Sequence, residues 1–297
     1  MTQQRPRVGY LGPAGTFSEQ ALLASAGEQA VEPVALSSIF DAVVALAGGD
    51  LSWAIVPIEN SLEGSINITL DLLADAAHGV CIVGEAVLRV SHALIAARSL
   101  APAEITTVTT HPQVPGQCTR LLRGELAGAR ILPASSTAEA VRAVVDADEP
   151  GAAAIGTVLA ARIYGGEVLR AGVEDRDDNE TRFVWLAREA DRDVRPPLRD
   201  STDEWKTSIV FWGLGAERPG WLVRCLDEFA RRDINLTKIE SRPRREQLGS
   251  YMFFADLAAT VHEERVAAAI AGLGALCEQA RVLGCYPAAV RAGADVA

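Results

Sequence analysis

Several short segments have the residue types and spacing of loops that bind anions at the start of a helix. Residues 16–19 (Thr-Phe-Ser-Glu) have the spacing of a capping box, and residues 136–139 (Ser-Thr-Ala-Glu) repeat it. The polar stretch 57–65 also lies between a predicted strand and a predicted helix. Free N–H groups at such helix ends bind carboxylates without a charged side chain. One capping box is usually only a structural device, but three such junctions indicate a ligand cleft.

A fourth segment, residues 178–183 with the sequence DNETRF, places a hydroxyl, a guanidinium and an aromatic ring at the start of an apolar strand. Its spacing alone fits an ordinary strand edge with an exposed arginine equally well. The sequence has no glycine-rich dinucleotide loop, no P-loop, no serine nucleophile elbow and no Cys–His pair with placeable triad partners. The four histidines lack ligand spacing, so we expect neither a metal site nor a cofactor. An enzyme of this kind would work by positioning and hydrogen bonding.

The elements that would hold these segments alternate between strand and helix as far as residue 187, which predicts an α/β fold with much parallel sheet. The predicted strands are 7–11, 53–57, 84–97, 106–110, 130–133, 152–155 and 181–187, and the predicted helices are 18–26, 39–47, 67–76, 113–122, 137–145 and 158–164.

A charged, proline-containing stretch without apolar periodicity follows and is predicted to be a linker over residues 189–203. Residues 204–288 then show the order of a ferredoxin-like βαββαβ unit, with two helices on one face of an antiparallel sheet, and 289–297 form a tail. Its predicted strands are 206–214, 235–242, 250–257 and 280–286, and its helices are 220–231 and 263–273.

Composition narrows the class of protein. The 297 residues are 49% hydrophobic and 23% charged, which is typical of a globular chain long enough for two domains. A formal net charge of −11 disfavours nucleic-acid binding. No apolar run of signal-peptide or transmembrane length follows the polar start, so we expect a cytoplasmic protein that does not bind membranes. Five scattered cysteines favour reduced thiols over a disulfide framework.

Six motifs, in this order, resemble those of prephenate dehydratases across residues 7–188. They are GYLGPAGTFSEQAL, VPIENSLEGSINITLDLL, HPQ followed by QC, SSTAEAV, AAIGT and NETRF. The later run RPGWLVRCLDEFARRDINLTKIESRPRR, with YMFFADL after it, resembles an ACT regulatory domain. The resemblance implies a catalytic domain over residues 1–188, similar to type II periplasmic binding proteins. One lobe would comprise about 1–76 with 170–188, the other 77–169, and the active site would lie between them.

The resemblance also implies the reaction, in which prephenate loses CO2 and hydroxide and becomes phenylpyruvate. Thr181 is implied as the hydroxyl that hydrogen-bonds the leaving group, and Arg182 is a candidate partner for a substrate carboxylate. Phe183 would shape an apolar wall. Glu59 and Glu63 are rival acids of lower rank, since an ionised glutamate would repel a dianionic substrate. The remaining implied neutral donors are Asn60, Ser61, Ser136 and Thr137.

ACT domains pair side by side and bind an amino acid between them, so the resemblance implies a homodimer or homotetramer with L-phenylalanine as effector. Residues 220–222 read Gly-Trp-Leu where ACT domains usually have Gly-Ala-Leu. Trp221 could fill part of the effector pocket, change the effector preference or contact another subunit. Arogenate dehydratase and a non-catalytic amino-acid sensor remain alternatives. The implied effector-binding residues are Arg218, Pro219, Gly220, Trp221, Leu222, Asn235, Leu236, Glu240, Ser241, Arg242 and Pro243.

Overall fold

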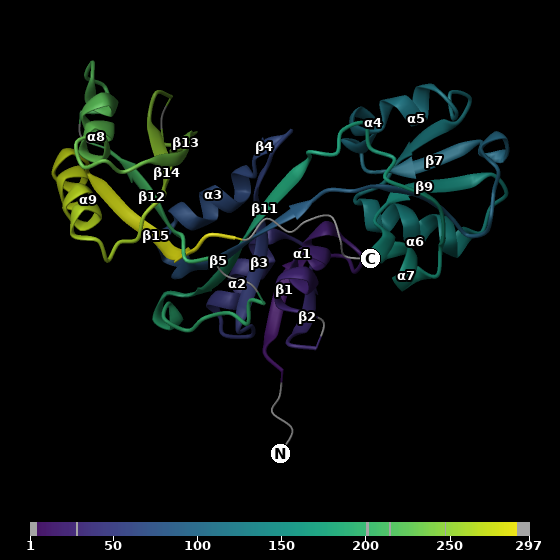
Figure 1. The fold of residues 1–297 in the computed structure, drawn as a ribbon, viewed down its shortest axis with the longest axis horizontal. Helices are drawn as coiled ribbons and strands as arrows, with labels where there is room; N and C mark the ends of the chain where they lie inside the picture. Colours follow the sequence, from purple (N-terminus) through teal and green to yellow (C-terminus); the bar gives the residue numbers. More distant parts are fainter. Residues whose placement is uncertain (1–4, 28, 200–201, 214, 247, 290–297) are drawn as a thin grey trace.

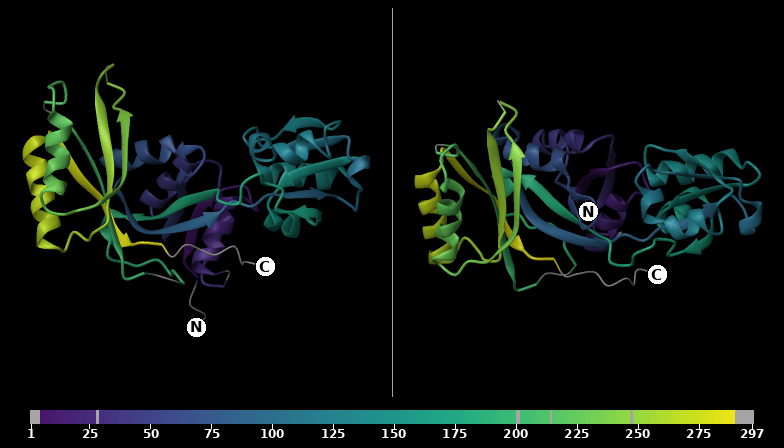
Figure 2. Two further views of the ribbon diagram at one scale, coloured as in Figure 1. Left: turned by 45° about the horizontal axis from the view of Figure 1, so that its top comes forward. Right: turned by 90° about the horizontal axis from the view of Figure 1, so that it is seen from above.

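Figure 1 shows the computed structural model, which describes residues 5–27, 29–199, 202–213, 215–246 and 248–289. Two sheets organise the described chain, one of ten strands and one of five. The larger sheet runs from an N-terminal lobe into a C-terminal unit, and the smaller sheet forms a second lobe. Figures 1 and 2 place the second lobe and the C-terminal unit at opposite ends of the molecule, with the first lobe between them.

The first lobe is built on a mixed sheet in which β1 pairs in parallel with β2 and β3, and β11 pairs antiparallel with β3 and β5. Thr16 and Ser38 cap the first two helices by accepting hydrogen bonds from backbone N–H groups. The strands are β1 (Arg7–Leu11), β2 (Glu32–Leu36), β3 (Trp53–Asn60), β4 (Gly64–Ser65), β5 (Val80–Arg89) and β11 (Glu180–Arg188). The helices are α1 (Phe17–Ala26), α2 (Ile39–Ala47), α3 (Asn67–Ala74) and the 3-10 turn η1 (Ala76–His78).

The second lobe packs helices on a five-stranded sheet of order β10-β6-β9-β7-β8. Helix α6 can approach β9 closely because Gly156 has no side chain. A Cβ atom there would lie 2.5 Å from Val141 Cγ2 and 2.8 Å from the Thr137 carbonyl oxygen. The strands are β6 (Ala93–Ala96), β7 (Thr107–Thr110), β8 (Arg130–Pro133), β9 (Ala152–Gly156) and β10 (Glu167–Ala171). The helices are η2 (Pro102–Glu104), α4 (Val114–Gln117), α5 (Thr119–Arg123), α6 (Thr137–Ala147) and α7 (Val158–Tyr164).

The C-terminal unit has the predicted βαββαβ order, with antiparallel strands in the spatial order β13-β14-β12-β15. Helices α8 and α9 cover its outer face, and the first lobe lies against the other face (Figure 2). The short turn η3 (Glu189–Asp191) precedes the unit. The elements of the C-terminal unit are β12 (Trp205–Trp212), α8 (Trp221–Ala230), β13 (Leu236–Pro243), β14 (Tyr251–Leu257), α9 (Glu264–Leu276) and β15 (Gln279–Pro287).

One strand contact joins the C-terminal unit to the first lobe, because β15 runs parallel to β5 and pairs with it at Gly284 and Ile82. Behind this contact, Tyr286 and Phe254 share one apolar core with Leu73 of the first lobe. The C-terminal unit is thereby docked on the lobe through both its sheet edge and its sheet face.

The structure corrects several predicted boundaries. The predicted strand 84–97 is two strands, β5 and β6, which belong to different sheets. The chain therefore crosses to the second lobe after β5, not near residue 77, and crosses back after β10, which ends at Ala171, close to the expected residue 170. The predicted helix 113–122 is two short helices that meet at Cys118.

The strands β2 and β10 were missed because both are edge strands with largely exposed side chains and little apolar patterning. The predicted linker is partly packed against the first lobe. Leu198 contacts the first-lobe core, and the Arg199 backbone N–H donates to the Ser25 carbonyl at 2.8 Å. In the described ranges, no helix has both the length and the apolar character needed to cross a membrane.

Candidate active site

A cavity of about 710 Å³ lies where the two lobes meet, and both lobes contribute to its wall. The first lobe supplies the loop before α1, the end of β3 and the start of β11. The second lobe supplies the starts of α4 and α6. Two contacts hold the lobes together beside it, from Thr157 Oγ1 to the Gly15 carbonyl at 2.5 Å and from the Tyr164 hydroxyl to the Ala14 carbonyl at 2.8 Å.

Asn60 and Thr181 form a hydrogen-bonded pair in the wall of this cavity. They face each other on β3 and β11, and Asn60 Nδ2 donates to Thr181 Oγ1 at 2.9 Å. Asn60 Oδ1 accepts from the backbone N–H groups of Leu62 and Glu63, which fixes the orientation of the amide. No described protein acceptor takes the Thr181 proton, so the hydroxyl accepts from Asn60 and remains able to donate into the cavity.

Of the helices that begin at the cavity, α1, α2 and α6 have a serine or threonine at the N-cap. The predicted anion-type junctions included those of α1 and α6. Ser136 caps α6 by accepting from the Glu139 N–H at 3.0 Å, and Thr137 also lines the wall. Thr16 caps α1, and Ser37 lies at the start of α2, a junction that the sequence analysis missed. Helix N-termini carry partial positive charge and unpaired N–H groups, so this wall favours carboxylates.

The ionisable side chains in the cavity wall are those of glutamate and histidine. Among the described lining residues there is no arginine or lysine, whereas Glu63 and Glu139 are present. Gln113 Nε2 of the second lobe donates to Glu63 Oε2 at 3.4 Å, which bridges the lobes across the cavity. An anionic ligand in this cavity would be bound by neutral donors and helix N-termini.

His92, Gln117 and Asn179 extend the polar wall and were not expected. Gln117 Oε1 accepts from Asn179 Nδ2 at 3.3 Å and lies 3.0 Å from His92 Nε2. Because an amide oxygen only accepts, the His92 proton lies on Nε2 and its Nδ1 is an acceptor. Burial lowers the pKa of His92, which is therefore neutral at pH 7. The available sequence signals were the QC and NETRF motifs, which contain Gln117 and Asn179, and the Ser91-His92 pair between two apolar runs.

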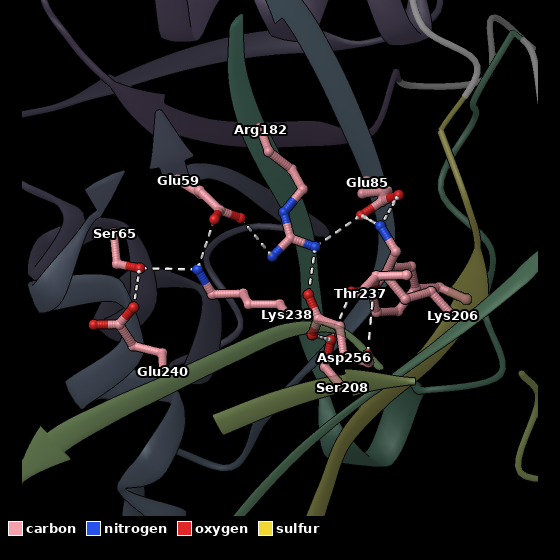
Figure 3. A network of polar contacts seen from close by, with 11 residues as sticks. Glu59, Ser65, Glu85, Arg182, Lys206, Ser208, Thr237, Lys238, Glu240 and Asp256 are labelled. Carbon is pink, nitrogen blue, oxygen red and sulfur yellow. Dashed lines mark hydrogen bonds and ion pairs between the residues drawn. The ribbon is translucent and has the colours of Figure 1, made fainter. Parts of the chain in front are cut away.

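Arg182 does not line the cavity, which corrects the expectation that it binds a substrate carboxylate. Successive side chains on a strand point to opposite faces, and Arg182 points away from Thr181. Its guanidinium lies at the junction with the C-terminal unit, 2.7 Å from Asp256, 3.3 Å from Glu85 and 3.3 Å from Glu59 (Figure 3).

Two further predicted site residues lie outside the cavity wall. Phe183 lies on the same face of β11 as Thr181, but two residues further along the strand it is buried in the first-lobe core. Ser61 joins the two strands instead, since its Oγ accepts from the Glu180 N–H at 3.0 Å. The rival acid Glu59 also points to the C-terminal junction, whereas Glu63 lines the cavity.

The predicted effector residues occupy both ends of the C-terminal sheet. Residues 218–222 and 241–243 lie at the end of the sheet where β12 and β13 finish, and 235–236 lie at the other end. The Trp221 indole is buried against Phe211 and Phe253, so it contacts its own core and not another subunit. Its Nε1 donates to the Leu276 carbonyl at 2.8 Å.

Strand β13 contains the sequence ESRP at residues 240–243, and two of these predicted side chains face the first lobe. Ser65 Oγ donates to Glu240 Oε2 at 3.0 Å, and the Arg242 guanidinium binds the Asp71 carboxylate at 2.9 Å. Ser241 and Pro243 point to the other face and are exposed. The described residues contain no group of three or more His, Cys, Asp or Glu side chains that could hold a metal ion.

Comparison with known proteins identifies the family. A family model described as prephenate dehydratase matches residues 8–191. The prephenate dehydratase of Mycobacterium sp. strain JLS is 39% identical over 299 residues, which cover 97% of this chain and 91% of the relative. The chain belongs to the prephenate dehydratase family.

Solved structures share the fold over nearly all of the chain. The prephenate dehydratase from Arthrobacter aurescens, crystallised in complex with L-Phe, has a TM-score of 0.83 at 34% identity and covers 98% of this chain and 93% of its own. A structure named GqqA, described as a novel type of quorum quenching acylase, has a TM-score of 0.82 at 26% identity. The match covers 95% of this chain and 98% of that chain.

Proposed function

We propose that this chain converts prephenate to phenylpyruvate in the interlobe cavity, with Thr181 as the donor to the departing hydroxyl. The observation that supports this most is the Asn60–Thr181 hydrogen bond. Because Asn60 Nδ2 donates to Thr181 Oγ1, the threonine proton is left for a ligand in the cavity. Two backbone N–H groups hold the Asn60 amide in this orientation, so the donor direction is set before substrate binds.

The reaction needs little chemistry from the protein, which suits this wall of neutral groups. The ring carboxylate leaves as CO2, its bonding electrons enter the ring, and the 4-hydroxyl departs as water after taking up one proton. Thr181 donates a hydrogen bond to that oxygen and relays the proton, since a neutral threonine is a weak acid. A preorganised neutral donor can stabilise such a transition state by roughly 3 kcal/mol.

The helix N-termini account for binding of the two substrate carboxylates. The starts of α1, α2 and α6 all face the cavity, and the nearest ionised side chains, Glu63 and Glu139, would repel an anion. The substrate carboxylates are therefore bound by backbone N–H groups and neutral side chains. Ser136 and Thr137 supply these side chains on the second lobe, and Asn60 supplies one on the first. Closure of the lobes on the substrate would strengthen these contacts by excluding water.

Substitution of Thr181 tests the proposal. Thr181→Ala should lower kcat by roughly 10²–10³-fold, because it removes a hydrogen-bond donor to the leaving group. Thr181→Ser keeps the hydroxyl and should retain most of the activity, while Thr181→Val keeps the shape and should resemble Thr181→Ala. Phenylpyruvate formation from prephenate would be followed spectrophotometrically. A folded Thr181→Ala variant with turnover within a few-fold of the unsubstituted protein would exclude this role.

Parallel assays separate the rival functions, with phenylpyruvate measured from prephenate and phenylalanine from arogenate. Arogenate differs from prephenate only beside the side-chain carboxylate, so faster turnover of arogenate would indicate an arogenate dehydratase. An amide substrate tests the acylase activity described for GqqA. A sensor without catalytic activity would bind one or more of these compounds and convert none of them.

For the C-terminal unit we propose an ACT domain that binds L-phenylalanine between two copies of the chain. The Arthrobacter aurescens relative was crystallised with L-Phe, and the βαββαβ order fits the domain. Strand β13 is the free edge of the ten-stranded sheet, and Ile239 on it is 48% exposed. A second copy packed antiparallel beside β13 would bring Asn235 and Leu236 of one copy next to residues 218–222 of the other.

A further inference from the structure

A cluster of ionic side chains, from 2% exposed at Glu85 to 38% exposed at Glu59, joins the first lobe to the C-terminal unit on the face of the sheet opposite to the cavity. Figure 3 shows it around the Arg182 guanidinium. Lys206 Nζ lies 2.7 Å from Glu85 Oε1, and Lys238 Nζ lies 2.9 Å from Glu59 Oε1. Strands β3, β5 and β11 of the lobe supply Glu59, Glu85 and Arg182, and the C-terminal unit supplies Lys206, Lys238 and Asp256.

The cluster is balanced in charge and largely withdrawn from water. Three carboxylates oppose three cations, and the side chains of Glu85, Asp256 and Lys238 are 2%, 7% and 8% exposed. Burial alone would lower the pKa of Arg182, but the surrounding carboxylates, led by Asp256, raise it overall. The chain contains only two lysines, Lys206 and Lys238, and both are in this cluster.

The position of Arg182 in the sheet links this cluster to the cavity. In the β3–β11 ladder, Thr181 pairs with Asn60, and the next pair is Arg182 with Glu59. The first pair faces the cavity, and the second faces the C-terminal unit. Neighbouring Cα atoms are about 3.8 Å apart and joined by a planar peptide, so a shift of Arg182 and Glu59 moves Thr181 and Asn60 with them.

We infer that Arg182 is a positioning residue for the Asn60–Thr181 pair. Its ion pairs hold β11 and β3 against β14 of the C-terminal unit and thereby set the direction in which the Thr181 hydroxyl donates. The inference rests on the function proposed above. It differs from a carboxylate-binding role, because the guanidinium lies outside the cavity, and from a purely structural role, because it predicts a defect in the chemical step.

The two kinetic constants separate these roles. A misplaced donor weakens the transition state with little effect on ground-state binding, so Arg182→Gln should lower kcat by roughly 10-fold with KM within about 3-fold of the original. Arg182→Lys keeps the charge but cannot reach several carboxylates at once, and its kcat should lie between those of Arg182→Gln and the unsubstituted protein. Arg170→Gln, which breaks the exposed Arg170–Glu125 pair of the second lobe, is the control and should change neither constant.

Arg182→Gln leaves buried carboxylates without their cation and could therefore unfold the junction. The double variant Arg182→Gln/Asp256→Asn removes one charge of each sign and should recover the apparent unfolding midpoint. If Arg182 positions the catalytic pair, kcat stays low in this stable double variant. Recovery of kcat together with stability would overturn the inference, as would an unchanged kcat with a raised KM, or no change in either constant. Absence of turnover in both the unsubstituted protein and Arg170→Gln would instead overturn the proposed function and the inference resting on it.

Discussion

The arrangement of hydrogen bonds around Asn60 sets the direction in which Thr181 donates. The Asn60 amide oxygen accepts two backbone N–H groups, so its nitrogen must face Thr181 Oγ1, Asn179 Oδ1 and the Glu180 carbonyl. A threonine alone could donate in several directions, because its hydroxyl rotates. With Asn60 donating to it, the threonine proton is directed toward the cavity without any charged group.

His92 gives a pH-dependent prediction for stability. Burial lowers its pKa below the ordinary value of 6.5 in the folded state. Between the folded and unfolded pKa values only the unfolded state takes up the proton, so this group reduces stability progressively as pH falls below about 6.5. Its burial contributes no such penalty at higher pH, where the imidazole is neutral in both states.

The expected result is a thermal unfolding midpoint that falls with pH through this range, and a shallower fall for His92→Gln. Gln can still donate to Gln117 but does not titrate. His262→Gln is the control, since His262 lies in a turn at an exposed site, and it should keep the original slope. Equal slopes for His92→Gln and the unsubstituted protein would show that His92 is not the group responsible.

The family resemblance implied Thr181, Asn60, Ser136 and Thr137, and all four line the cavity. It placed Arg182 wrongly, although the period-two alternation of a strand already excludes two neighbouring side chains from one cavity wall. The partners of Arg182 could not be predicted, since Asp256 lies in another unit of the chain and meets it only after docking. Gln117 belongs to the QC motif but was given no role, and His92 lies in no motif.

At the scale of elements, strong local signals predicted helices α2 and α7 to the residue, whereas the edge strands β2 and β10 gave no signal. Helix α2 has a serine cap and a continuous apolar run, and α7 begins after the Thr157 cap and ends at Gly165. Strand β2 contains proline and glutamate and has exposed side chains, so only its pairing with β1 defines it. The parallel contact between β15 and β5 is likewise tertiary.

That contact depends on Gly284, and its substitution is predicted to weaken the docking. A Cβ atom at Gly284 would lie 2.1 Å from the Ile82 carbonyl oxygen, which is backbone and cannot move aside without displacing β5. Gly284→Ala should therefore destabilise the protein by roughly 1–3 kcal/mol, measured as a lower midpoint of urea unfolding.

Gly274→Ala is the matched control. Gly274 is an exposed residue of α9, and a Cβ atom there meets no atom within 4 Å. Alanine in a helix interior is favoured over glycine by roughly 0.5–1 kcal/mol, so this variant should be slightly more stable. Equal stability of the two variants would mean that β15 does not approach β5 as closely as described.

For the whole molecule, the ionic cluster provides a route by which the C-terminal unit could act on the cavity. Strand β13 carries Lys238 between the predicted effector residues, and its Nζ binds Glu59 of β3 and Ser65 of β4. Both strands flank the loop that contains Glu63, which lines the cavity. A movement of β13 on effector binding would therefore change the position of Glu59 and, with it, of the adjacent Asn60.

Lys238→Met tests this route, since methionine retains an unbranched apolar stem but removes the cation. Glu59 keeps its contact with Arg182, so turnover without effector should change little, whereas the response to L-phenylalanine should weaken by roughly 5-fold or more in the midpoint of its titration. Lys206→Met is the control because Lys206 is the other lysine of the cluster but pairs with Glu85 on β5, away from β3. If both variants respond to L-phenylalanine as the unsubstituted protein does, the signal does not pass through Lys238. If both lose the response equally, the junction as a whole carries it, and neither lysine has a special role.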